Sequence, residues 1–237
     1  MIGILLTGPP PDGIWRIGRD PDPLSASKSA SSSELSKPGT GNRFDSPTGG
    51  YGVRYFGTGL DGCFGETLAR FRPDPVLTKV IGGEWGEMGV MNVGDIPADW
   101  RQRRTAVRVG FPDGGQNAKF SGGLRFLDIE SVDTREAMRN DLAELLAYYH
   151  YPDLDVALVR GRDRRVTRYI SQWVFEQADE DGHPLYAGIR YLSRLNSEWE
   201  CWAVFDDVEM KELERRPIRR EDASYQRIAK LYGLTPY

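Results

Sequence analysis

The chain has 237 residues with a formal net charge of −4, and 39% of its residues are hydrophobic while 28% are charged. This composition is typical of a folded globular protein and excludes a largely disordered chain. The acidic excess argues against a broad nucleic-acid surface, which needs clustered basic side chains. We therefore expect a single domain over residues 1–237 that does not bind nucleic acid directly.

The only two cysteines, Cys63 and Cys201, form neither a disulfide framework nor a paired metal-ligand motif. The sequence thus predicts no metal site and fits a reducing compartment. The apolar run Met1–Leu6 is too short for a signal peptide, and no later run reaches membrane-spanning length. We expect a cytoplasmic protein that does not contact a membrane.

The first predicted elements are a strand and two loops. Residues Ile14–Ile17 alternate as a short strand, with Trp15 and Arg16 on opposite faces. Residues of about 25–40, rich in Ser, Ala and Lys, predict a flexible loop. Glycine and proline then mark Gly39–Gly50 as a second loop, and such loops often carry functional side chains.

A strand and a short helix follow. Gly52–Phe56 is strand-like, and apolar residues then recur at helical spacing, which predicts a helix with Glu66 in its first turns. Further strands are expected at Val76–Ile81, Thr105–Val109 and Leu124–Ile129, with a possible insertion over about 82–123.

The C-terminal half mixes helices and strands irregularly. Asp133 and Glu136 have the spacing of a capping box, which predicts a helix that begins at Asp133, includes Tyr149 and ends before Pro152. The later elements are expected as a strand at Val156–Val159, a helix over 166–177, strands at Ile189–Leu192 and Cys201–Phe205, and a helix at Asp222–Tyr232. This order favours an α+β fold over a doubly wound parallel sheet.

Familiar catalytic motifs are absent from the sequence. It contains no Walker loop and no G-x-S-x-G elbow. The two histidines, His150 and His183, have no nucleophile or ligand cluster near them in sequence, so surface or capping roles are expected.

Three residues carry the strongest chemical pattern. Tyr55 follows Arg43 by twelve positions, and Glu66 follows Tyr55 by eleven. An arginine can hold a pyrophosphate, an aromatic ring can stack on a base, and a carboxylate can stabilise positive charge developing on a ribose. Taken singly, each has a structural alternative: a loop salt bridge for Arg43, a half-buried core position for Tyr55, and an acid in the first helical turn for Glu66.

These motifs, in this order, resemble the RES-domain family. The matching segments are Ile14–Ile17 with Arg16, Asn42–Pro47 with Arg43, then Tyr55 and Glu66, the late strand Gly188–Arg194 with Ser193, and Glu200–Phe205. The resemblance spans about residues 14–232. Phe44-Asp45 replaces the family's more frequent Trp-Asn pair.

The resemblance implies an ADP-ribosyltransferase-like fold, a single domain with a bent or split mixed sheet flanked by helices. It also implies an enzyme that cleaves the nicotinamide–ribose bond of NAD, with water or inorganic phosphate as acceptor and no bound cofactor. Glu66, Tyr55 and Arg43 would be catalytic, and Arg16, Arg43, Tyr55 and Ser193 would bind NAD. The family includes bacterial toxins, so a helix-turn-helix antitoxin partner is implied, and a homo-oligomer is compatible with the sequence.

Other functions remain open at the level of sequence. An ADP-ribosyltransferase that modifies a protein would use the same pocket, and a non-catalytic nucleotide-binding or interaction module would keep the fold alone. A glycosidase with two carboxylates lacks a clear second acid. Arg16 and Ser193 also have structural alternatives, as a strand-edge charge and a strand serine. The arginine clusters Arg162–Arg165 and Arg215–Arg220 are expected on solvated faces, with contact to a partner or to nucleic acid as the alternative.

Overall fold

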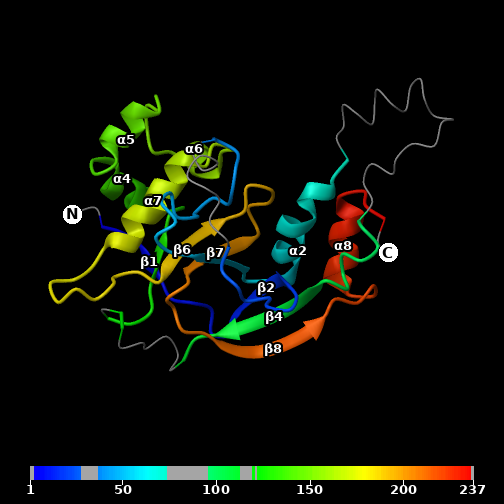
Figure 1. The fold of residues 1–237 in the computed structure, drawn as a ribbon. Helices are drawn as coiled ribbons and strands as arrows, with labels where there is room; N and C mark the ends of the chain where they lie inside the picture. Colours follow the sequence, from blue (N-terminus) through cyan, green and yellow to red (C-terminus); the bar gives the residue numbers. More distant parts are fainter. Residues whose placement is uncertain (1–2, 28–36, 74–95, 113–118, 121, 236–237) are drawn as a thin grey trace, which may run out of the picture.

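The computed structural model describes residues 3–27, 37–73, 96–112, 119–120 and 122–235. This part of the chain is built on one eight-stranded sheet in the order β1-β5-β6-β7-β3-β2-β4-β8 (Figure 1). Strands β5 and β6 run parallel, and the other neighbouring strands are antiparallel. The strands are β1 (Leu6–Thr7), β2 (Ile14–Arg19), β3 (Val53–Gly57), β4 (Arg104–Gly110), β5 (Phe126–Asp128), β6 (Gly188–Leu192), β7 (Glu200–Phe205) and β8 (Lys211–Pro217).

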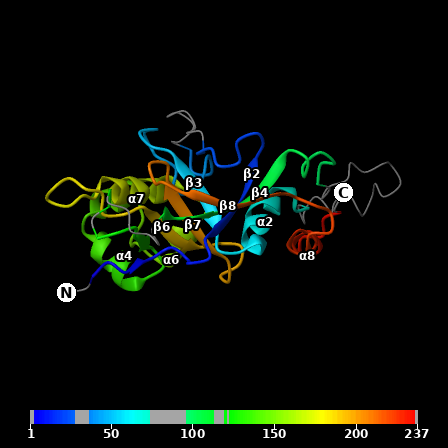
Figure 2. The same ribbon diagram turned by 90° about the horizontal axis from the view of Figure 1, so that it is seen from below.

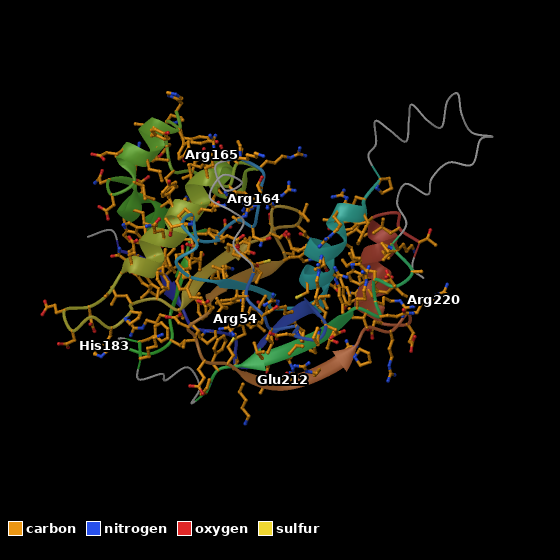
Figure 3. All side chains as sticks on the ribbon, in the orientation of Figure 1. Arg54, Arg164, Arg165, His183, Glu212 and Arg220 are labelled. Carbon is orange, nitrogen blue, oxygen red and sulfur yellow. The ribbon has the colours of Figure 1, made fainter. Side chains whose placement is uncertain are left out.

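The helices form two groups at opposite ends of this sheet, as two perpendicular views show (Figure 1 and Figure 2). One group lies near β5 and β6, and the other near β2 and β4. The mixed sheet with packed helices confirms the predicted α+β class. The first group contains α4 (Val132–Arg139), α5 (Ala143–Tyr148), α6 (Val156–Arg160) and α7 (Arg165–Glu176); the second contains α2 (Leu60–Leu68), the 3₁₀ turn η1 (Ala69–Phe71) and α8 (Ala223–Leu231).

Each helix group closes its own apolar core against the sheet. Helix α7 buries Val166, Ile170 and Val174 at helical spacing, in a cluster shared with β6 and β7. At the other end, Phe64 of α2 and Tyr225 of α8 pack with Trp100 in a second cluster. The sheet therefore carries a separate apolar core at each end.

Several predicted elements are confirmed. Strands β2, β3, β4, β5, β6 and β7 overlap their predicted segments, as do helices α2, α7 and α8, and Gly233 follows α8 with a φ of 66°. Residues 39–50 contain neither helix nor strand, as expected of a loop. The predicted strand Val76–Ile81 and residues 28–36 of the predicted flexible loop lie outside the described residues. Strand β4 lies within the stretch 82–123 and pairs with both β2 and β8.

The long helix predicted from Asp133 to Tyr149 is wrong in two respects. The chain forms two helices, α4 and α5, separated by a turn at residues 140–142. Asn140 and Asp141 are weak helix formers, and the turn still lets Leu142 and Leu146 bury their side chains. The N-cap position of α4 is Ser131 rather than Asp133, and no side chain makes a capping hydrogen bond there.

The strand predicted at Val156–Val159 is also wrong, because these residues form helix α6. Asp155 decides the outcome locally: its Oδ1 atom accepts a hydrogen bond from the Leu158 amide at 2.7 Å, the contact of an N-cap residue. The sequence prediction missed β8 as well. Most residues from Lys211 to Arg216 are charged, so the sequence showed no apolar strand pattern there. The segment is an edge strand, which pairs with β4 on one side.

Candidate active site

The centre of the candidate site is a hydrogen bond between Glu66 and Ser193. Helix α2 carries Glu66, while Ser193 directly follows strand β6. The Ser193 hydroxyl donates to Glu66 Oε1 at 2.5 Å across 127 positions of sequence. Ser193 is buried with a relative exposure of 1%, whereas Glu66 is exposed. A buried hydroxyl thus orients a carboxylate that solvent can reach.

Glu66 lies in the second half of α2, so its predicted place in the first turns is wrong. It is the seventh of nine helical residues, and the acidic residue of the first turn is Asp61. A carboxylate near the C-terminal end of a helix gains nothing from the helix dipole. The first-turn explanation therefore fails for Glu66, while Ser193 supplies a specific reason for its orientation.

The loop between β6 and β7, residues 193–199, holds Ser193 in place. The Ser193 amide donates to Trp199 O at 2.9 Å, and the Leu195 amide donates to Ser193 Oγ at 3.0 Å. In Figure 1 this loop, in gold, lies between α6 and α2. Trp199 packs so closely on α2 that a Cβ atom at Gly65 would lie 2.0 Å from its Cζ3 atom. Glycine at position 65 therefore permits the contact that joins the loop to the helix carrying Glu66.

Tyr55 uses its hydroxyl to hold the loop that contains Arg43. The hydroxyl donates to Asp45 Oδ1 at 2.8 Å and accepts from the Phe44 amide at 3.0 Å. Burial raises the pKa of Tyr55 well above its ordinary value, and the nearby Asp45 carboxylate adds to the shift. Thr167 strengthens the same loop by donating to Arg43 O at 2.6 Å. Tyr55 therefore holds the Arg43 loop in position in this structure.

The Arg43 guanidinium caps the C-terminal end of α6. It donates to the carbonyl oxygens of Val159, of Gly161 at 3.3 Å and of Arg160 at 3.5 Å. A cation at a helix C-terminus is favourable because the free carbonyl groups concentrate negative charge there. Burial lowers the pKa of Arg43, while Tyr191 and Glu66 favour its charged form. Arg43 is thus an electrostatic neighbour of Glu66 with its own structural contacts.

Arg16 lies on the opposite face of the sheet from Tyr55. Trp15 is the cross-strand partner of Gly57, so Arg16, the next residue in β2, shares its face with Phe56, and its guanidinium lies 5.8 Å from that ring. Burial and the nearby Arg54 lower the pKa of Arg16 to about 10. Its buried Nη1 atom has no hydrogen-bond partner among the described residues. Arg16 is a cation with unused donor capacity.

Comparison with known proteins identifies the family. The RES domain model matches residues 14–226, which is most of the chain. The chain belongs to the RES-domain family. No curated protein shows significant sequence similarity to it. Among solved structures, it is similar to a chain of the MbcT–MbcA toxin-antitoxin complex of M. tuberculosis, with 10% identity, a TM-score of 0.43, and coverage of 98% of this chain and 91% of that chain.

The RES domain also places residues near Glu66 that sequence analysis did not select. Tyr191 is buried, makes an edge contact with Phe44 at 5.0 Å, and has its pKa raised by burial, by Cys201 and by Glu66. The Tyr232 hydroxyl donates to Gly65 O at 3.1 Å, next to Glu66. Tyr191 lies in the segment Gly188–Arg194 that supplied Ser193 and Tyr232 in the predicted C-terminal helix, but neither was given a role from the sequence, because both reach the site only through the fold.

Arg194 adds an exposed cation to this neighbourhood. It follows Ser193 directly, and its charge acts on both Arg43 and Tyr232. In sequence, Arg194 belongs to the motif that supplied Ser193 but was given no role of its own. Arg194 is exposed, whereas the Arg43 guanidinium is hydrogen-bonded to backbone carbonyl groups at the C-terminal end of α6.

Other reactive side chains in the RES domain have structural explanations. Both thiols are buried, and burial raises the pKa of Cys63 to about 12, so this thiol is protonated at neutral pH. His150 has a φ of 60° just beyond α5, as expected of a helix-ending residue. Asp179, Asp181 and His183 bring ligand-type atoms within 4.8 Å of one another, in a turn where Asp179 Oδ1 accepts two backbone amides. No helix in the described residues is long and apolar enough to cross a membrane.

Proposed function

We propose that this protein binds NAD and cleaves the bond between nicotinamide and ribose. The observation that carries the proposal is the solvent-reachable Glu66 carboxylate held by the buried Ser193 hydroxyl. Breaking an N-glycosidic bond builds positive charge on the ribose, so a fixed carboxylate stabilises the transition state more than the ground state. Family membership supplies the expectation that the nucleotide is NAD.

The other assigned residues support binding and positioning in this proposal. Arg43 places positive charge near Glu66 and is assigned to the NAD phosphates. Arg16, which the sequence also assigned to NAD, lies on the other face of the sheet from Tyr55, so we do not assign it to this pocket. Arg194 is a second candidate phosphate contact because it is exposed beside Ser193. Tyr55 positions the Arg43 loop through Asp45 and is also assigned to contact nicotinamide. Nicotinamide is the leaving group, and the ribosyl carbon is taken by water or inorganic phosphate.

Neither the two cysteines nor Ser193 is arranged to act as a nucleophile. Cys63 and Cys201 are both buried with raised pKa values, and Ser193 donates to the weakly basic Glu66 carboxylate rather than to a histidine or a lysine. This favours direct attack by water or phosphate on the ribose over a covalent serine or cysteine intermediate. An ADP-ribosyltransferase acting on a protein remains the alternative, since the same carboxylate would serve it.

The cellular role follows from the proposed chemistry and from the family resemblance. An enzyme that consumes NAD without restraint harms its own cell, so we propose a toxin acting in the cytoplasm and held inactive by an antitoxin protein. The resemblance implies a partner of helix-turn-helix type. Inducing the protein alone is expected to lower cellular NAD and stop growth. Stable NAD with abundant folded protein would contradict the toxin role.

The decisive test compares two carboxylate variants of the same helix. Glu66→Gln should reduce nicotinamide release about 100-fold or more while NAD binding persists, because only the charge felt by the transition state is removed. Asp61→Asn is the matched control, since Asp61 is paired with Arg227 at 2.6 Å on the same helix. Near-parental turnover by folded Glu66→Gln would overturn the mechanism. Product analysis with and without phosphate, and with candidate acceptor proteins, separates hydrolysis, phosphorolysis and protein modification.

A further inference from the structure

A part-buried ion pair outside the assigned residues holds the loop that presents Ser193. Glu130 lies in the turn after β5, and its side chain is 9% exposed. It accepts from Arg160 Nη2 at 2.8 Å and from Arg160 Nε at 3.1 Å. Its Oε1 atom also accepts the Leu192 amide at 2.9 Å. Leu192 is the last residue of β6, so Glu130 fixes the backbone immediately before Ser193.

Arg160 extends the contact to the other part of the same loop. It belongs to the C-terminal end of α6, and its Nη1 atom donates to Ser197 Oγ at 3.0 Å. Glu130 and Arg160 together therefore contact the chain just before Ser193 and four residues after it. The carbonyl groups of this same end of α6 also receive the Arg43 guanidinium. Those carbonyl groups belong to the backbone, so the Glu130–Arg160 side-chain pair acts on the Ser193 loop and not on Arg43.

We propose that Glu130 is a positioning residue, which acts through Arg160 and Leu192 to set the Ser193 hydroxyl on Glu66. The proposal rests on the proposed NAD cleavage for its kinetic consequence, and its structural consequence can be measured separately. Removing the Glu130 charge leaves the part-buried Arg160 guanidinium without its counter-charge, so the loop shifts to expose Arg160 further to water. A small displacement of an orienting group is enough to reduce turnover strongly.

The test variant is Glu130→Gln, which keeps an acceptor for the Leu192 amide but removes the charge facing Arg160. The matched control is Asp163→Asn. Asp163 and its partner Arg165 have side-chain exposures of 15% and 28%, close to the 9% and 26% of Glu130 and Arg160. The control pair lies at the start of α7, and the contacts of Asp163 are with Arg165 and Tyr151 rather than with the Ser193 loop.

In steady-state kinetics, Glu130→Gln should lower kcat by about 10- to 100-fold with KM for NAD changed by less than about threefold, because the carboxylate that acts in the transition state is misplaced while binding groups remain. Glu130→Asp should recover part of this loss, because it restores the charge. Asp163→Asn should keep kcat within about threefold of the parent. An equal loss of kcat in Glu130→Gln and Asp163→Asn overturns the proposal.

Amide hydrogen exchange tests the positioning independently of turnover. The Leu195 amide reports on Ser193 directly because it donates to Ser193 Oγ. Its exchange should accelerate about 10-fold or more in Glu130→Gln and stay at the parental rate in Asp163→Asn. An unchanged Leu195 rate overturns the proposal. If the parent releases no nicotinamide while Leu195 responds as expected, the proposed function fails and the positioning role stands. Should Glu130→Gln not fold, Ser197→Ala removes only the Arg160 contact and is measured in the same two ways.

Discussion

Substituting Gly65 by alanine tests whether the packing of Trp199 on α2 controls the candidate site. An added Cβ atom would lie 2.0 Å from Trp199 Cζ3, 2.3 Å from Cη2 and 2.7 Å from Cε3. Carbon atoms pack best at about 3.5 Å or more, so the ring must retreat by roughly 1.5 Å. These atoms belong to the rigid indole ring, which has no rotatable bond of its own to relieve the contact. The loop or the helix therefore has to move.

The magnitude follows from two opposing contributions. Alanine is favoured over glycine inside a helix by about 1 kcal/mol, whereas overpacking a tight contact costs about 1–3 kcal/mol. The free energy of unfolding of Gly65→Ala should therefore fall by only about 0–2 kcal/mol. Activity should fall far more. Trp199 O accepts the Ser193 amide, so moving the ring shifts Ser193, and a displacement near 1 Å costs about 100-fold in rate.

Two glycines of the same region complete the series. At Gly62 the added Cβ atom would lie 3.2 Å from Trp199 Cβ, and at Gly59 it would meet nothing within 4 Å. Nicotinamide release should be highest in Gly59→Ala, lower in Gly62→Ala and lowest in Gly65→Ala. Urea unfolding of each variant checks that it is folded. If Gly65→Ala is folded and as active as Gly59→Ala, the link from Trp199 to the Glu66–Ser193 pair is refuted.

Two further variants separate structural from ligand-binding roles. Arg43→Ala should lower the free energy of unfolding by about 1–3 kcal/mol, because the α6 carbonyl groups lose a charged donor, and should weaken NAD binding in titration; Arg43→Lys should recover either property only in part. NAD binding equal to that of the parent in Arg43→Ala would remove Arg43 from the phosphate site. Tyr55→Phe should lower the free energy of unfolding by about 1–3 kcal/mol, because buried Asp45 loses the Tyr55 donor and the Phe44 amide loses its acceptor. Unchanged urea unfolding of Tyr55→Phe would show that these two contacts do not stabilise the loop.

The sequence by itself determined the elements whose apolar spacing is strong and local. Alternation predicted β2 and helical spacing predicted α7, because each pattern reflects one face that must be buried. The apolar run Cys201–Phe205 predicted β7, which is buried on both faces. Family-like motifs also selected both members of the Glu66–Ser193 pair. These features depend on side chains within one element, so a linear reading of the chain can find them.

Only the tertiary structure decided how those side chains meet. The hydrogen bond from Ser193 to Glu66 joins residues 127 positions apart, and no local pattern encodes such a distance. Arg43 was selected as a phosphate clamp, yet the fold brings the end of α6 against its guanidinium. Glu130 carried no signal, because an isolated acidic residue becomes informative only when burial removes water from its charge and packing supplies Arg160 as its partner.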